Sequence, residues 1–182
     1  MSVDWRGYTC YTPLHAGVPN TLPRAETRAE HNHLMAARPE RRRALTELLT
    51  VNGVELTADD AGLTALDTWF TANVELSPGD PARLADIWYG VVTDVGLFIG
   101  DLAIERCPNL HWVFHTFGRR NVYYQCSVLM GFRVTEPRYS IEPLGSIAVH
   151  GYRAAAGLPE ERDALVKMMK AIEFAASGEY LD

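Results

Sequence analysis

The sequence predicts a single α+β domain over residues 1–182, with five or six helices around a buried central helix at about 81–106. Three observations lead to this prediction. The segment 81–106 is apolar on nearly all sides, which is typical of a helix inside a domain. Residues from about 110 to 142 are rich in β-branched and aromatic side chains, which predicts a two- or three-stranded antiparallel sheet. Most other segments have apolar residues at spacings of three and four, which indicates amphipathic helices.

The first 22 residues predict an extended, aromatic-rich arm. They contain Trp5, Tyr8 and Tyr11 together with prolines, and they show no periodicity. We expect these aromatic side chains to pack on the body of the domain. No apolar stretch follows a basic start, so the sequence does not predict a secretory signal, and we expect a cytoplasmic protein.

Prolines and glycines predict where the outer helices begin and end. Because proline is tolerated in a first helical turn but is costly further in, we expect one helix to end near Arg38 and another to begin at Pro39. A third helix follows the capping cluster at 57–60. Two more are expected at about 143–157 and 159–178, each closed by a glycine.

The central helix and the strands follow from similar signals. Asp80 is expected to cap the central helix, with Pro81 as its first residue. Beyond it, segments 109–117 and 122–132 flank a short polar loop that contains glycine, which predicts an antiparallel hairpin. Residues 138–142 could add a third strand, restricted to the edge by the prolines on either side.

Two aspartates interrupt the apolar central helix. Asp94 and Asp101 are seven residues apart and therefore lie on the same side, with Glu105 one turn further. Burying an unpaired carboxylate is prohibitive, so each must reach a solvent-filled groove or find a partner. We expect Asp101 to pair with an arginine or to cap a neighbouring helix, and a functional acidic groove is the alternative. Gly96 and Gly100 predict a close approach by another backbone.

The segments DVGLFIGD (94–101), PNLHW (108–112), VLMGF (128–132) and PRYS (137–140) resemble those of a family of small uncharacterised bacterial proteins. In that family a D-x-G-x-x-x-G-[DE] helix leads into a strand that contains tryptophan. The likeness covers roughly residues 38–157. It implies the fold and a bacterial source, and it brings no known activity.

Charge and cysteine content limit the classes of function. Residues 51–106 carry ten acidic residues and two arginines, which argues against nucleic-acid binding and is compatible with a basic protein partner. The acids within the central helix also argue against a membrane span. Three cysteines without CxxC spacing indicate no structural metal site, and we expect no metal or cofactor.

Four residues could form a catalytic site. His111 or His115 could meet Asp101 or Glu105 and give a His–carboxylate pair capable of general acid–base chemistry. His31 and His33 are expected to lie on opposite sides of their helix, exposed to solvent. The sequence shows no nucleophile elbow, phosphate-binding loop or dinucleotide fingerprint.

The candidate binding residues are the two aspartates of the central helix and a cluster at the hairpin tip: Asp94, Asp101, Arg119, Arg120, Tyr123 and Tyr124. Arginine and tyrosine near a hairpin tip suit a protein contact or an anion. The leading hypothesis is therefore a non-enzymatic protein that binds another protein, of immunity or accessory type. The alternative is a small-molecule-binding protein or hydrolase-like enzyme with a His/carboxylate pocket between the central helix and the hairpin. A homodimer is compatible with either.

Overall fold

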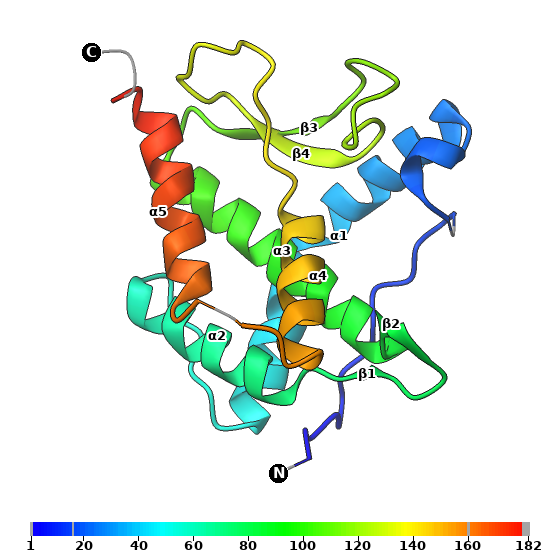
Figure 1. The fold of residues 1–182 in the computed structure, drawn as a ribbon, viewed down its shortest axis with the longest axis vertical. Coiled ribbons are helices and arrows are strands. Elements are labelled where there is room, and N and C mark those ends of the chain that lie inside the picture. The colour runs from blue at the N-terminus through cyan, green and yellow to red at the C-terminus, as the bar shows by residue number, and fades with distance from the viewer. Residues whose placement is uncertain (1, 16, 160, 180–182) are drawn as a thin grey trace.

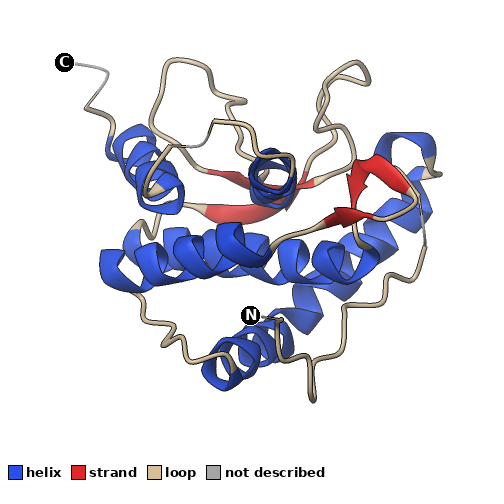
Figure 2. Cartoon of the chain, turned by 60° about the horizontal axis from the view of Figure 1, so that its bottom comes forward, coloured by secondary structure: helices blue, strands red, loops and turns tan. Residues whose placement is uncertain are grey.

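The computed structural model describes residues 2–15, 17–159 and 161–179. It confirms the α+β prediction, with five α-helices and two small antiparallel sheets in the described part of the chain. Figure 1 shows their arrangement, and Figure 2 shows that the strands form two short ribbons in a mostly helical molecule. In chain order the elements are the 3-10 turn η1 (Pro19–Thr21), α1 (Arg24–Val51), α2 (Asp60–Asn73), β1 (Leu76–Ser77), β2 (Asp80–Leu84), α3 (Asp86–Arg106), β3 (His111–Phe114), β4 (Ser127–Met130), α4 (Pro143–Ala155) and α5 (Ala164–Ser177).

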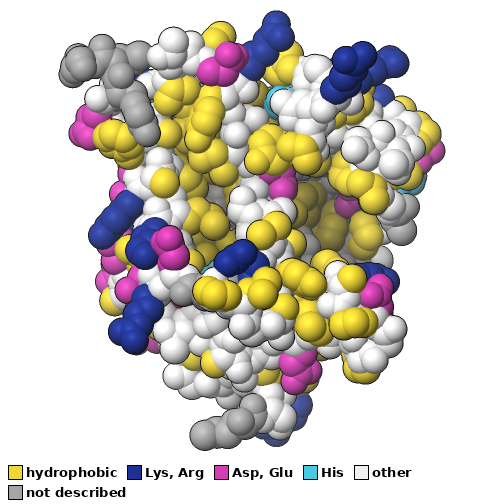
Figure 3. Space-filling model, in the orientation of Figure 1, with side chains coloured by type: hydrophobic (Ala, Val, Ile, Leu, Met, Phe, Trp, Pro, Cys, Tyr) yellow, Lys and Arg dark blue, Asp and Glu magenta, His cyan; other side chains and the backbone are white. Residues whose placement is uncertain are grey.

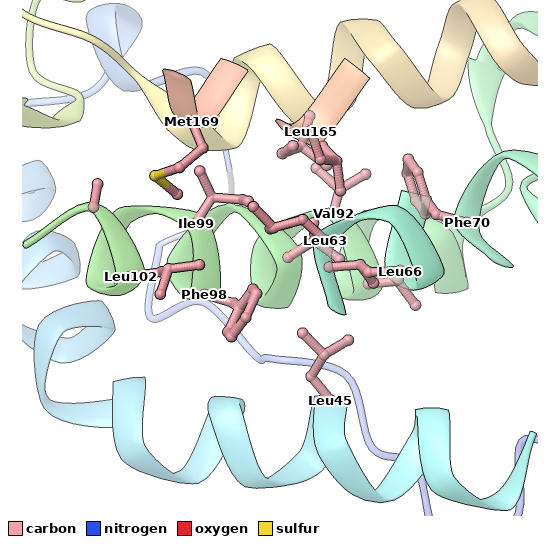
Figure 4. Close-up of a cluster of buried hydrophobic side chains, with 14 of the residues drawn as sticks. Leu45, Leu63, Leu66, Phe70, Val92, Phe98, Ile99, Leu102, Leu165 and Met169 are labelled. Atoms are coloured by element: carbon pink, nitrogen blue, oxygen red, sulfur yellow. The ribbon is translucent and has the colours of Figure 1, made fainter. Parts of the chain in front are cut away.

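Helix α3 is the buried central helix that the sequence predicts. It packs against α1 on one side and against α4 and α5 on the other, and α2 packs against α4 and α5. Figure 4 shows the core between these helices, where Phe98 of α3 lies near Leu45 of α1, and Ile99 lies near Met169 of α5. Helix α3 is long and apolar enough to cross a membrane, but 72% of that apolar stretch is buried inside the molecule, as in the core helix of a soluble protein.

Helix α1 continues through Pro39, so the prediction of two separate helices at this point is wrong. Proline has no N–H to donate to the carbonyl of Met35, four residues earlier. The side chain of Arg38 supplies the missing donor, because its Nε lies 3.2 Å from that carbonyl oxygen. A 28-residue helix results, and it runs along one whole side of the molecule.

Strand β2 occupies the start of the predicted central helix, so the roles expected for Asp80 and Pro81 are wrong. The turn signal before them closes a hairpin, in which β1 and β2 pair antiparallel. Asp80 accepts a hydrogen bond from the backbone N–H of Ala82 at 3.0 Å, which stabilises the turn rather than a helix. Helix α3 therefore begins only at Asp86.

The second sheet has two strands, in agreement with the two or three predicted, and each strand is shorter than its predicted segment. Strands β3 and β4 pair antiparallel, with His111 opposite Met130 at one end. The loop that joins them, residues 115–126, is much longer than a tight turn. The expected third strand is reduced to a single bridge between Ile141 and Leu129, because the flanking prolines cannot donate to a ladder.

Helix α4 agrees with its prediction, whereas α5 begins at Ala164, later than expected. Asp163 adopts a left-handed conformation (φ 56°), which separates α5 from the residues before it. Glu160, one of the acids expected in the first turn of this helix, lies outside the described residues, as do Met1 and Ala16 of the arm. The rest of the arm packs on the body through its aromatic residues, and the ring of Trp5 meets that of Trp88 edge-on at 5.2 Å between centroids.

Candidate binding pocket

Asp94 lies in the middle of the protein and is held by three hydrogen bonds. Arg41 donates to both of its carboxylate oxygens, from Nε at 2.7 Å and from Nη2 at 2.6 Å. The hydroxyl of Tyr8 in the arm donates at 2.7 Å. Burial raises the pKa of Asp94, while its bonds to Arg41 and Tyr8 lower it. The hydrogen bond to Asp94 raises the pKa of Arg41, which keeps the guanidinium charged. Asp94 thus joins α3, α1 and the arm.

Asp101 and Glu105, which lie on the same side of α3 as Asp94, also pair with arginines of α1. Arg38 donates to Asp101 from Nη1 at 2.5 Å, and the indole N–H of Trp112 donates to the same oxygen at 2.9 Å. Arg42 pairs with Glu105 near the surface. The prediction that Asp101 pairs with an arginine is confirmed. These carboxylates hold α3 in register with α1, and they do not line an open groove.

The structure does not assemble the four residues of the predicted catalytic set. His111 is exposed at the start of β3, whereas His115 is fully buried beyond the end of that strand. The two histidines therefore do not share a strand face. In the described part of the chain no hydrogen bond or ion pair joins either histidine to Asp101 or Glu105, because these acids are bonded to α1.

The predicted hairpin-tip residues lie in the long loop 115–126. Arg119 and Arg120 are exposed, and Tyr123 and Tyr124 are half-buried in consecutive turns. Tyr123 and Tyr124 therefore lie in turns and not in the strand segment that the sequence predicts from residue 122. None of the four lines the cavity of the candidate site.

That cavity lies elsewhere and has a volume of about 490 Å³. Its walls come from five segments: the arm, the first half of α1, the first half of α3, the residues at and just before the start of β4, and the start of α4. We call it the arm pocket. Figure 3 shows a hollow right of centre on the face seen in Figure 1, walled largely by hydrophobic side chains. The pocket is lined by Cys10, Tyr11, Pro13, His15, Gly17, Pro19, Leu22, Thr27, Glu30, His31, Leu34, Asp86, Tyr89, Gly90, Thr93, Gln125, Cys126, Ser127, Glu142 and Leu144.

His31 and Ser127 meet in the wall of the arm pocket. The Nδ1 atom of His31 lies 2.8 Å from the hydroxyl oxygen of Ser127. Burial lowers the pKa of His31, and the nearby Arg28 and Arg38 lower it further, so the imidazole is neutral at pH 7. The expectation that His31 is simply exposed is therefore wrong. Nothing local in the sequence indicates this contact, because the two residues are 96 positions apart.

Glu142 supplies a buried carboxyl group to the same pocket. It is the N-cap of α4, and its Oε2 accepts a hydrogen bond from the backbone N–H of Gly145 at 2.5 Å. Burial raises the pKa of Glu142 to about 7, and backbone hydrogen bonds from Gly145 and Leu144 oppose this. Burial, followed by the nearby Glu142, also raises the pKa of Cys126 to about 11, so this thiol remains protonated and is not an activated nucleophile.

Glu30 holds the arm in place as the outer wall of the pocket. Its Oε1 accepts from the hydroxyl of Tyr11 at 2.6 Å. Its Oε2 accepts from the backbone N–H groups of Leu14 and His15 at 2.7 and 3.2 Å. These bonds fix the arm across α1, so the pocket is a preformed feature of the folded chain.

The arrangement suits binding better than nucleophilic catalysis. The His31–Ser127 contact could in principle activate the hydroxyl, but within residues 2–15, 17–159 and 161–179 no carboxylate is hydrogen-bonded to His31. A serine nucleophile typically works with a base that a third group holds in orientation. The described residues also contain no group of three or more His, Cys, Asp or Glu side chains placed to hold a metal ion.

The structure thus replaces the predicted sites with a pocket that the sequence does not reveal. No lining residue belongs to a functional motif in its own segment, and only the fold brings these residues together.

The resemblance to a family of small bacterial proteins stays a prediction. Comparisons with protein-family models, with curated proteins and with solved structures found no match for the chain.

Proposed function

We propose that this protein binds a small organic molecule in the arm pocket, without transforming it, in the cytoplasm of a bacterial cell. One observation carries the proposal: a preformed cavity of about 490 Å³ has mainly apolar walls, at which His31, Ser127 and Glu142 place polar groups. Small-molecule sites typically have volumes of about 300–1,000 Å³ and combine apolar walls with a few convergent polar groups. The lack of a carboxylate bonded to His31 among the described residues supports binding without catalysis.

The site differs in place from the pocket expected between the central helix and the hairpin. The sequence predicts that Asp101, Glu105 and His111 line that pocket. In the structure Asp101 pairs with Arg38, and Glu105 pairs with Arg42. The arm pocket instead uses the first half of α3 and the residues before β4, and the arm covers it.

Filling the arm pocket tests the proposal. Thr93 lines the pocket, whereas Thr46 lies on the exposed side of α1, and each donates to the carbonyl four residues earlier at 2.9 Å. In a screen of neutral, cationic and anionic small molecules, we expect at least one to raise the Tm of the wild type and of Thr46→Trp. A ligand at 100 times its Kd stabilises by about 2.7 kcal/mol, or roughly 5 °C or more for a chain of this size. Thr93→Trp should lose this shift.

Two results would contradict the proposal. A molecule that stabilises Thr93→Trp as much as the wild type binds outside the arm pocket. A screen in which no molecule of any charge shifts the Tm of the wild type would leave the pocket without a ligand.

Association with another protein, in an immunity or accessory role, is the second candidate. Loop 115–126 exposes Phe117 and Val122 beside Arg119 and Arg120, with Val122 76% exposed. Arg138 lies over the Phe117 ring, 5.2 Å from its centroid. Exposed aromatic and apolar side chains among arginines are common in protein interfaces. This surface favours an acidic partner, whereas part of the acidic segment expected to attract a basic partner is paired internally.

A pull-down from bacterial lysate tests the second candidate. We expect the wild type to retain a partner at low salt and to release it at high salt, because exposed charges are screened. The double variant Arg120→Glu/Val122→Asp should retain none at low salt, and its Tm should match that of the wild type because both side chains are exposed. Equal retention by the variant would exclude this loop as the contact.

A further inference from the structure

We infer that the arm pocket selects organic cations, with an ammonium group held at Glu142 and the apolar body of the ligand against the pocket walls. This inference rests on the proposed function and names the class of ligand. It is carried by the charge of the lining, by the positions of the nearest arginines and by the surroundings of Glu142.

The lining of the arm pocket contains carboxylates and no described lysine or arginine. Glu30 and Glu142 accept hydrogen bonds from a tyrosine hydroxyl and from backbone N–H groups, and neither has a lysine or arginine partner in the part of the chain that the structure describes. The third carboxylate, Asp86, lies at the rim, 3.6 Å from Arg83. Glu30, together with Glu142 above pH 7, gives the interior a negative charge.

Arg28, Arg38 and Arg41 of α1 lie near the pocket residues His31 and Cys10, but each of them contacts another group. Arg41 binds Asp94 through two hydrogen bonds, and Arg38 binds Asp101. Arg28 lies over the ring of Phe114, 4.8 Å from its centroid. None of the three lines the pocket, so an incoming cation does not have to displace a basic side chain from it.

Glu142 is a buried carboxyl group of the pocket without a basic partner among the described residues. Among the causes that shift its pKa, burial is the largest and no basic side chain takes part. A buried carboxylate without a counter-ion is unfavourable, and a ligand ammonium would supply that counter-ion. The same lining contains the aromatic rings of Tyr11 and Tyr89. Arg83 already lies over the Tyr89 ring, 5.8 Å from its centroid, so the preference for a cation does not rest on these rings.

Three probes of similar shape and different charge test the inference: 2-phenylethylamine, 2-phenylethanol and 3-phenylpropionate. At pH 8, isothermal titration of the full chain should give a Kd for the amine at least tenfold lower than that for the alcohol. The carboxylate should bind most weakly. The amine stays protonated at this pH because alkylammonium groups titrate near 10.

Glu142→Gln tests the role of the carboxylate, because it keeps the shape and removes the charge. We expect the amine to lose at least tenfold in affinity in this variant, whereas the affinity of the alcohol should change less than twofold and so show that the pocket is intact. Glu55→Gln is the matched control, since Glu55 is exposed and does not line the pocket. It should leave all three affinities unchanged.

A pH series uses the unaltered protein and remains informative even if Glu142→Gln is unstable. Because burial raises the pKa of Glu142 to about 7, lowering the pH from 8 to 6 should protonate it and weaken amine binding about tenfold. The affinity of the alcohol should not change. The titratable groups around the pocket are Cys10, Tyr11 and His15 of the arm, Glu30 and His31 of α1, Asp86 and Tyr89 of α3, and Cys126 before β4. Loss of the pH dependence in Glu142→Gln would separate Glu142 from these groups.

The outcomes separate the inference from the proposed function. If the alcohol binds and the amine binds no tighter, the cation preference is wrong and small-molecule binding stands. An amine preference that survives in Glu142→Gln also overturns the inference. If none of the three probes binds, the inference is wrong, and the screen with Thr93→Trp decides the proposed function.

Discussion

Replacing Asp94 with alanine is expected to lower the free energy of unfolding by about 3–5 kcal/mol, because Arg41 would then be buried without its counter-ion. The side chain of Arg41 is 5% exposed and that of Asp94 is fully buried, so water cannot take the place of the carboxylate. Tyr8 would also lose its hydrogen-bond acceptor. Urea unfolding followed by circular dichroism measures the difference, and its midpoint should fall without a large change in slope.

Glu105→Ala is the matched control for this variant. It breaks an acid–arginine pair between the same two helices, but the side chains of Arg42 and Glu105 are 38% and 48% exposed. Exposed pairs of this kind contribute about 0–1 kcal/mol. If Asp94→Ala costs no more than Glu105→Ala, the buried pair does not hold α3 in register.

A second variant separates the loss of an ion pair from the loss of packing. Arg41→Met with Asp94→Leu removes both charges and leaves apolar side chains of similar length. Because replacing a whole buried pair with apolar residues is often nearly neutral, this double variant should recover most of the stability that Asp94→Ala loses. An unfolding midpoint as low as that of Asp94→Ala would show that the charges themselves are needed.

Gly100→Ala is expected to destabilise the protein by about 3 kcal/mol, although alanine usually favours a helix by about 1 kcal/mol over glycine. A Cβ at this position would lie 2.0 Å from Cζ2 of Trp112, well inside van der Waals contact. The ring cannot simply move, because its N–H is bonded to Asp101 at 2.9 Å. Either that bond breaks or β3 shifts away from α3. Thermal unfolding followed by circular dichroism measures the loss.

A double-mutant cycle with Trp112→Leu identifies the cause. In the Trp112→Leu background the ring is gone, so we expect Gly100→Ala to cost less than 1 kcal/mol there. Gly79→Ala is the control for a glycine with open space around it, since no atom lies within 4 Å of its added Cβ. A cost for Gly100→Ala that is equal in both backgrounds would contradict the steric explanation.

The sequence predicts the central helix α3 better than the helix α1 that packs against it. All-round apolar character identifies α3. The one-turn spacing of Gly96 and Gly100 predicts close approach by another backbone, which Leu144 provides at Gly96, whereas at Gly100 the ring of Trp112 approaches instead. Asp101 is predicted to need an arginine, yet the choice of Arg38 depends on α1 running unbroken through Pro39. Local rules end the helix there, because they do not foresee that the side chain of Arg38, next to the proline, supplies the missing donor within the same helix.

The candidate site is not predictable from local signals. The arm pocket joins five segments, and its key contact links His31 to Ser127 across 96 positions. The prediction of where α3 starts is wrong for a related reason. The turn signal before Asp80 fits either a helix cap or a hairpin. Leu84 is buried in the hairpin, and the predicted helix 81–106 would bury it as well, so this apolar residue does not distinguish the two structures.

The bond between Tyr8 and Asp94 has a consequence for synthesis of the chain on the ribosome. The two residues are separated by 86 positions, so at about 5–20 residues per second the arm waits roughly 4–17 s for its partner. During this interval Trp5 and Tyr8 lack the helix against which they later pack. A nascent chain of this protein therefore presents an aromatic segment that a chaperone can hold until α3 emerges.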